Sequence, residues 1–173
     1  MSDKKRYLIT AVTLGCIAMG GALLIGGTNL LTRERIKQNE INAINKGIAT
    51  IFHSESAKYE SKVLEGEHKY LQELYVVKDN ENQVGYAYKT SGSNMYGKIT
   101  LLVGFDNATQ SFIGTSVIVN EQTYASTLVD KYLNPLNEGT RDLDDVSCGA
   151  TYGAKLVREM VNEALDNVKE LWS

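Results

Sequence analysis

The residues best placed for chemistry form a glycine-broken turn directly before an apolar helical stripe: Ser147, Cys148, Gly149, Ala150 and Thr151. Backbone amides in a first helical turn lack intrahelical acceptors, and the peptide dipoles add positive potential there. Gly149 and Ala150 have almost no side chain to shield those amides, and the Thr151 hydroxyl would lie beside them. The pattern is typical of a helix start that binds phosphate. An ordinary cap made by Ser147 or Thr151 explains the same residues without a ligand.

Other arrangements for catalysis are missing from the sequence. It has no GxSxG, Walker or HExxH motif, and His53 and His68 have no companion at metal-ligand spacing. Cys16 and Cys148, the two cysteines, lie far apart in the chain and predict neither an intrachain disulfide nor a cysteine metal site. We therefore expect no catalytic residue and no metal site.

Composition limits the class of protein. The chain has 173 residues, 43% of them hydrophobic, which is enough for one domain with a proper core. The net charge is −3 and the basic residues are scattered, so we expect no nucleic-acid partner.

The N-terminal part contains an uncharged run at 7–32 between two basic segments. About 20 apolar residues cross the hydrocarbon of a bilayer, so the run predicts a transmembrane helix. A cleaved signal peptide is the alternative, but the run is longer than a usual signal and has no A-x-A site. We expect residues 1–6 to be a cytoplasmic tail and the protein to be a single-pass cell-membrane protein with its domain on the outer face.

The remaining elements follow from hydrophobic periodicity. Isoleucines at steps of three and four predict a stalk helix at 33–52. Segments rich in valine, isoleucine, tyrosine and threonine, separated by turn compositions, predict an antiparallel meander of four strands at 73–79, 83–92, 97–107 and 111–122.

After the predicted sheet, residues 123–133 read as a short helix or structured loop, and a broad apolar stripe predicts a final helix from Thr151 onward. The expected fold class is α+β: one transmembrane helix and a stalk helix, followed by a domain at 53–173 in which a small antiparallel sheet packs with helices.

The stretch DVSCGAT at 145–151 resembles the flavinylation motif of the FMN-binding domain family, which includes the RnfG and NqrC subunits of ion-translocating respiratory complexes. The usual motif is Asp, two residues, Ser or Thr, then Gly-Ala-Thr. An N-terminal apolar segment ending in TNLLTRERI, a stalk helix, a small sheet and a motif opening the last helix match the RnfG type best.

This resemblance implies covalent FMN, joined through its phosphate to Thr151 by a separate flavin transferase. It implies an electron-transfer subunit of an Rnf-type ion-translocating complex, with polytopic membrane subunits as partners, rather than a self-contained enzyme. The implied FMN-binding residues are those of the motif, Asp145, Ser147, Cys148, Gly149, Ala150, Thr151 and Tyr152, together with Glu121, Thr123 and Tyr124 in the preceding loop.

The chain departs from the family pattern at three places. Cys148 occupies a position where Ser or Thr is usual, Ala154 replaces a further Ser or Thr, and the loop at 120–128 lacks the usual glycines. Cys148 is interpreted either as a stand-in for serine or as a reactive thiol at a helix start.

Two other functions fit the same sequence. One is a stand-alone extracellular flavoprotein that passes electrons outward. The other is a non-redox, membrane-anchored interaction or sensory domain that has kept the fold.

Overall fold

The computed structural model describes residues 3–172, except for the side chains at 3–6, 8, 24–26 and 28–31. The predicted tail at 1–6 lies partly outside these residues. Two compact units make up the chain, Met1–Ile41 and Asn42–Ser173. The division falls inside α1, a continuous helix of 49 residues at Asp3–Ile51.

The expectation of a transmembrane helix at 7–32 is corrected. Among the described residues, no helix combines the length and the apolar character that crossing a membrane requires. A spanning helix needs about 20 predominantly apolar residues. The cell-membrane location and the assignment of residues 33–52 as a stalk stay predictions.

An antiparallel sheet of five strands forms the centre of the second unit, in the order β1-β2-β3-β4-β5. The strands are β1 (Lys58–Lys62), β2 (Leu71–Asp79), β3 (Asn82–Asn94), β4 (Gly97–Asp106) and β5 (Ser111–Asn120). The four predicted strands are present as a meander, and β1 is an addition. Its sequence, KYESK, has no hydrophobic alternation because β1 is an edge strand on which only Tyr59 is half-buried.

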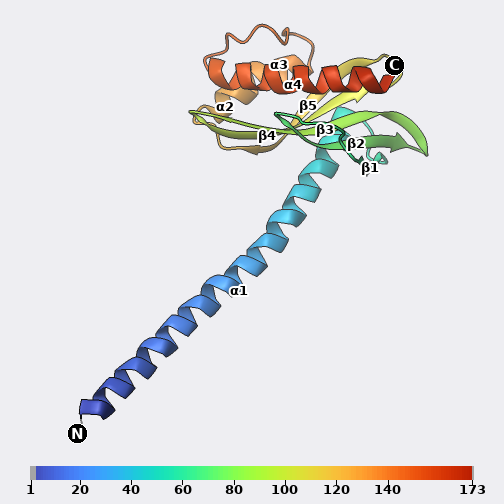
Figure 1. Ribbon diagram of the computed structural model, residues 1–173. Coiled ribbons are helices and arrows are strands. Elements are labelled where there is room, and N and C mark those ends of the chain that lie inside the picture. Colours follow the sequence, from blue (N-terminus) through green and yellow to red (C-terminus); the bar gives the residue numbers. More distant parts are fainter. Residues whose placement is uncertain (1–2, 173) are drawn as a thin grey trace. The chain divides into compact units, whose positions relative to one another are not determined.

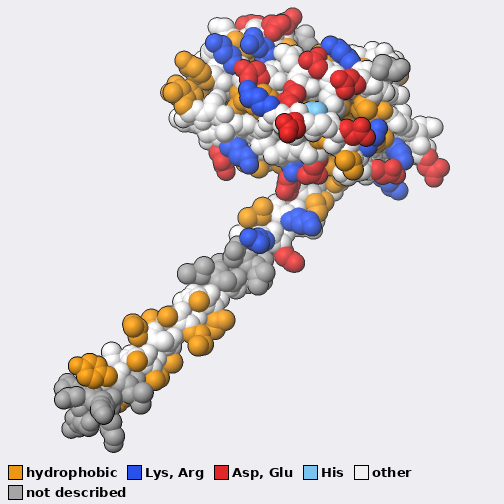
Figure 2. All heavy atoms as spheres, viewed as in Figure 1, with side chains coloured by type: hydrophobic (Ala, Val, Ile, Leu, Met, Phe, Trp, Pro, Cys, Tyr) orange, Lys and Arg blue, Asp and Glu red, His pale blue; other side chains and the backbone are white. Residues whose placement is uncertain are grey.

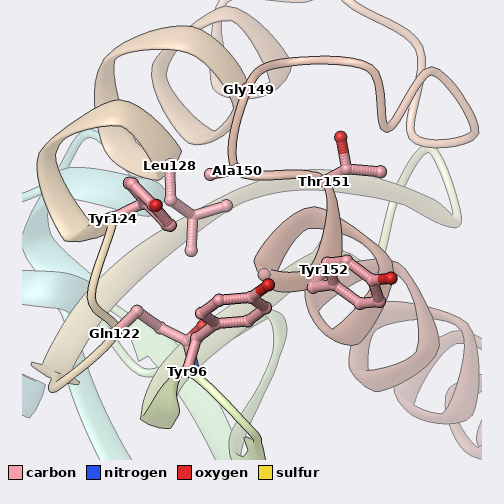
Figure 3. Close-up of a pocket in the computed structure, with 9 residues that line it drawn as sticks. Tyr96, Gln122, Tyr124, Leu128, Gly149, Ala150, Thr151 and Tyr152 are labelled. Atoms are coloured by element: carbon pink, nitrogen blue, oxygen red, sulfur yellow. The ribbon is translucent and has the colours of Figure 1, made fainter.

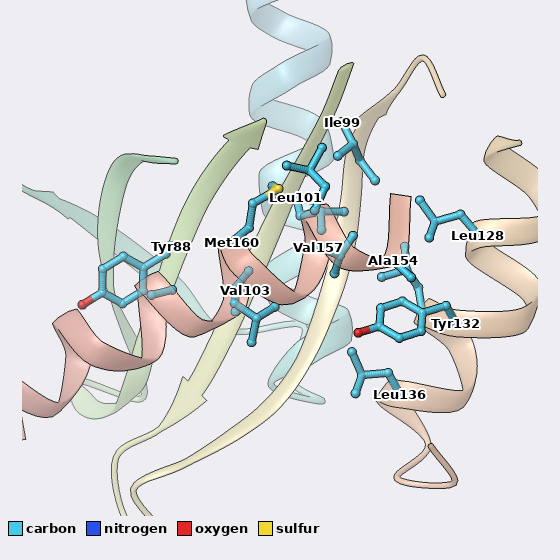
Figure 4. Close-up of a cluster of buried hydrophobic side chains, with 14 of the residues drawn as sticks. Tyr88, Ile99, Leu101, Val103, Leu128, Tyr132, Leu136, Ala154, Val157 and Met160 are labelled. Carbon is cyan, nitrogen blue, oxygen red and sulfur yellow. The ribbon is translucent and has the colours of Figure 1, made fainter. Parts of the chain in front are cut away.

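One face of the sheet is covered by α4 (Thr151–Trp172), which packs on β3 and β4 (Figure 1). Its buried side chains recur at helical spacing and include Ala154, Val157 and Met160, all 0% exposed. They meet Ile99, Leu101 and other inward residues of the sheet in the larger core (Figure 4).

The other face of the sheet carries a second, smaller core. Ile44, Ile48 and Ile51, in the last turns of α1, pack there with Val77 and Leu102 among others. The end of α1 therefore belongs to the domain itself, because Ile48 is 0% exposed and contributes its whole side chain to the core.

A short helical segment follows the sheet and closes one end of the larger core. It consists of α2 (Ala125–Leu128), the π-helical turn η1 (Val129–Leu133) and α3 (Asn134–Asn137). Leu128, Tyr132 and Leu133 are buried, and of the two predictions for 123–133 the short helix is the one that the structure has.

The visible surface of the domain carries Lys, Arg, Asp and Glu side chains mixed together (Figure 2). Hydrophobic side chains gather at its left end, where α2, the β3–β4 hairpin and the start of α4 lie in Figure 1.

Candidate functional site

A pocket of about 280 Å³ lies at the start of α4. Three segments that are distant in sequence form it: the β3–β4 turn, the loop after β5, and the turn into α4. Its lining residues are Tyr96, Gln122, Tyr124, Leu128, Gly149, Ala150, Thr151, Tyr152 and Gly153. Ligand pockets usually measure about 300–1,000 Å³, so a planar ring held here would stay partly exposed.

The turn into α4 supplies polar backbone to this pocket. The Ala154 N–H donates to the Ala150 carbonyl at 3.0 Å, which makes Ala150 the residue that precedes the helix. Gly149 has a φ of +82°, a left-handed conformation that other residues rarely adopt, and thereby turns the chain into the helix.

No side chain caps this helix start within the described residues. Neither the Ser147 nor the Thr151 hydroxyl makes a hydrogen bond there. The ordinary cap considered from the sequence is therefore not formed, and the first-turn amides stay available to a ligand.

Three tyrosine rings surround the pocket. The Tyr96 ring lies between the other two, with centroids 5.9 Å from Tyr124 and 5.4 Å from Tyr152. The ring planes are tilted by 57° in the Tyr96–Tyr124 pair and by 42° in the Tyr96–Tyr152 pair. The rings therefore do not stack face to face, and their faces stay available to a ligand. Tyr124 and Tyr152 are 52% and 58% exposed. Figure 3 shows Tyr96 and Tyr152 side by side below the Ala150–Thr151 turn.

The Asn94 side chain fastens the β3–β4 turn to α4. Its Oδ1 accepts the Tyr96 N–H at 2.8 Å, and its Nδ2 donates to the Tyr152 carbonyl at 3.1 Å. One amide group thus fixes the backbones of both tyrosines.

The loop after β5 holds the same turn from the other side. The Thr123 N–H and hydroxyl both donate to the Tyr96 carbonyl, at 2.8 and 3.1 Å. Gln122 is only 6% exposed, and its Nε2 donates to the Gly97 carbonyl. A Cβ on Gly97 would lie 2.1 Å from the Glu121 carbonyl oxygen, so this close approach requires glycine.

The acidic end of the motif shapes its loop. Asp145 pairs with Arg141, Nη1 to Oδ2 at 3.4 Å, and its Oδ1 accepts the Ser147 N–H at 3.3 Å. Arg141 also donates to the Asp145 and Ser147 carbonyls at 2.8 and 3.4 Å. These contacts order the loop but do not reach the pocket.

Cys148 is directed into the core. It is 6% exposed and belongs to the larger hydrophobic cluster. Tyr132, in the same cluster, donates its phenol to the Leu143 carbonyl at 2.5 Å, and burial raises the pKa of Tyr132. The interpretation of Cys148 as an exposed reactive thiol is not supported, because reactive thiols need access to solvent.

The predicted site residues therefore divide into two groups. Gly149, Ala150, Thr151, Tyr152 and Tyr124 line one pocket. The others, Asp145, Ser147, Cys148, Glu121 and Thr123, are not among its lining residues, although several of them order the loops around it.

Tyr96, Gln122, Leu128, Gly153 and the fastening residue Asn94 were missed by sequence reasoning. One signal for Tyr96 was present: it is a large aromatic residue in SGSNMY, a turn otherwise composed mainly of small polar residues.

The fold and site together define a small sheet-and-helix domain with an aromatic pocket next to free helix amides. The family model of the RnfG N-terminal region matches residues 1–51, and this match supports an RnfG-like subunit of an Rnf-type electron transport complex. The matched segment contains α1 and ends with it at Ile51, so the pocket residues lie outside the match. A comparison with curated proteins found no match.

Proposed function

We propose that this protein carries FMN covalently on Thr151 and relays electrons within an Rnf-type complex. The observation that carries the proposal is the position of Thr151: the hydroxyl-bearing residue of the motif opens α4 and lines the aromatic pocket. The family match supports the complex, and the residues around Thr151 support the cofactor.

The chain's residues suit the phosphate end of FMN. The N–H groups of Thr151, Tyr152 and Gly153 lie in the first turn of α4, where a helix has no acceptor for them. The helix dipole adds roughly half a positive charge at this end. Lys155, whose Nζ lies 5.9 Å from the Tyr152 ring centroid, adds a full positive charge nearby. A phosphate esterified to Thr151 would be hydrogen-bonded and electrostatically stabilised.

The three tyrosines of the pocket suit the isoalloxazine ring of FMN. In Figure 3 the Thr151 hydroxyl points away from the Tyr96 ring, and the flexible ribityl chain of FMN can bridge this separation. When bound, the isoalloxazine ring supplies the redox chemistry. The protein orients that ring and shields part of it from water, while the ester prevents its loss from a shallow pocket.

The departure at Cys148 is compatible with this role. The motif position that usually holds Ser or Thr is buried here, so the change from hydroxyl to thiol alters a core contact rather than the surface offered to the transferase. In the attachment step the Thr151 hydroxyl would lose its proton and form an Oγ–P bond, while the P–O bond to the leaving group of an activated flavin phosphoanhydride breaks. The transferase would bind this co-substrate, and the leaving group would depart with the bonding electron pair on its phosphate oxygen.

Coexpression with a flavin transferase tests the proposal. We expect the wild-type chain to show flavin absorbance that survives denaturation, Thr151→Ala to lose it, and Thr151→Ser to retain it because the hydroxyl is kept. Colourless wild-type protein made with an active transferase would favour a non-redox interaction domain.

Copurification tests membership in the complex. Recovery with several polytopic membrane subunits would support it, whereas isolation alone with bound flavin would favour a stand-alone carrier. We also propose that the domain lies on the outer face of the cell membrane; protease accessibility in intact and opened cells tests this location.

A further inference from the structure

We propose that Tyr96 is the principal ring-contact residue of the pocket and that Asn94 is the residue that positions it. Tyr96 would contact the face of a planar conjugated ring. The identity of that ring as the isoalloxazine of FMN rests on the proposed function.

Among the three tyrosines, Tyr96 has the most central place. Among the described residues, both ring–ring contacts in the pocket include it, with centroids 5.9 Å from Tyr124 and 5.4 Å from Tyr152. It is half-buried, whereas the other two are more than half exposed. A ring that enters the pocket therefore meets Tyr96 at its centre and the other tyrosines at its rim.

The Tyr96 backbone is also held on both sides. Asn94 Oδ1 accepts its N–H at 2.8 Å, and Thr123 donates to its carbonyl at 2.8 and 3.1 Å. Because a fixed backbone limits where the side chain can go, the ring is pre-organised for contact and loses less entropy on binding.

Asn94 makes hydrogen bonds to the backbone of two segments, the β3–β4 turn and the start of α4. Its second bond, at 3.1 Å to the Tyr152 carbonyl, ties the turn that carries Tyr96 to the helix start that carries Thr151. It fixes the distance between the ring contact and the attachment point, although Asn94 is not among the pocket's lining residues.

Flavin fluorescence gives a direct test in the full-length, FMN-loaded chain, because an electron-rich phenol ring in contact with a flavin quenches its emission. We expect Tyr96→Leu to be several-fold brighter per flavin than wild type, with the adduct still on Thr151. Tyr59→Leu is the matched control: Tyr59 is half-buried in the smaller core on the other face of the sheet, and its replacement should leave brightness unchanged. If FMN-loaded Tyr96→Leu fluoresces as weakly per flavin as wild type, the proposed contact between Tyr96 and the flavin ring is wrong.

Riboflavin, which has the ring but no phosphate, separates this inference from the covalent attachment. Titrated into the unloaded full chain, it should bind Tyr96→Leu about fivefold to tenfold more weakly than wild type, the scale of one aromatic contact. Tyr96→Phe keeps the aromatic ring and should keep the wild-type affinity. It is the control which shows that substitution at this position does not by itself unfold the pocket. Wild type that binds riboflavin but never forms an adduct overturns the proposed function alone; equal affinities of wild type and Tyr96→Leu overturn the inference.

The positioning role of Asn94 has its own readout. Asn94→Ala should brighten the loaded flavin and broaden its fluorescence lifetimes, because the Tyr96 ring is no longer held in one place. Asn94→Asp keeps the acceptor for the Tyr96 N–H but loses the donor to the Tyr152 carbonyl, so it should restore only part of the quenching. Lifetimes of Asn94→Ala identical to those of wild type would exclude a positioning role.

Discussion

Asn94 and Tyr152, 58 residues apart in sequence, are joined by a hydrogen bond of 3.1 Å from the Asn94 Nδ2 to the Tyr152 carbonyl oxygen. This bond brings the tip of the β3–β4 hairpin to the first turn of α4. The pocket therefore exists only when the sheet and the last helix have packed together, and changes that weaken this packing should affect both stability and ring binding.

Gly97 provides the first test. Gly97→Ala would put a Cβ 2.1 Å from the Glu121 carbonyl oxygen at a φ of +128°. Backbone strain alone costs about 1–3 kcal/mol, and the clash adds to it, so we expect a loss of ~3 kcal/mol or more in the free energy of unfolding, measured with urea. Gly139→Ala is the control, since its φ is +68° but a Cβ there meets nothing within 4 Å. Equal losses in the two variants would contradict the close approach.

Asn137 protects the exposed edge of β5. Its Oδ1 accepts the Thr115 N–H at 2.7 Å and its Nδ2 donates to the Thr115 carbonyl at 2.8 Å, as a neighbouring strand would. We expect Asn137→Ala to lose about 1–2 kcal/mol of unfolding free energy and to self-associate through the uncovered edge. Urea denaturation and size-exclusion chromatography measure the two effects. Asn134→Ala, in the same short helix, should resemble wild type.

Ile48 tests whether the end of α1 belongs to the domain core. It is 0% exposed, so Ile48→Ala should cost about 2–5 kcal/mol. Ile36, in the same helix, is 59% exposed, and Ile36→Ala should stay within about 0.5 kcal/mol of wild type. A tolerated Ile48→Ala would mean that the helix end does not pack on the sheet in solution.

Glu73 predicts a dependence of stability on pH. Burial raises the pKa of Glu73, but hydrogen bonds from Lys89 and Tyr75, each 2.8 Å, outweigh it and hold the pKa below its usual range. A lowered pKa in the folded state stabilises the protein above the unfolded-state pKa, and this contribution is lost as the pH falls through the folded-state pKa.

We therefore expect Glu73→Gln to be less stable than wild type at pH 7, by ~1 kcal/mol or less because the carboxylate is partly exposed. The difference should close below about pH 4. Denaturation of both proteins across pH measures it, with the exposed Glu55→Gln as the control. A gap that stays constant with pH would rule out the ionised carboxylate as its source.

The parts of the fold that follow from local sequence could be predicted. The four tyrosine-rich and β-branched strands and the helix from Thr151 have clear periodicity, and the structure places them accordingly. β1 could not be recognised, because a charged edge strand has no apolar pattern and gains its structure from pairing with β2. The transmembrane prediction rested on the absence of charge at 7–32 and was wrong, because no helix among the described residues is both long and apolar enough to cross a membrane.

The site was predictable only where it is continuous in sequence. The turn at 149–152 could be identified, since its small residues and helix start are local features. Tyr96 and Gln122 reach the pocket through long-range pairing of strands and loops, which one sequence does not reveal. Cys148 was placed near the chemistry by its position in the chain, but its side chain is directed into the core.

The covalent bond between Thr151 and FMN is the basis of the proposed function. The most direct measurement is mass spectrometry of the peptide that contains Thr151, from protein coexpressed with its flavin transferase. We expect this peptide to carry the added mass of FMN joined through its phosphate, with fragment ions that locate it on Thr151. An unmodified peptide, or an adduct on another residue, would contradict this expectation.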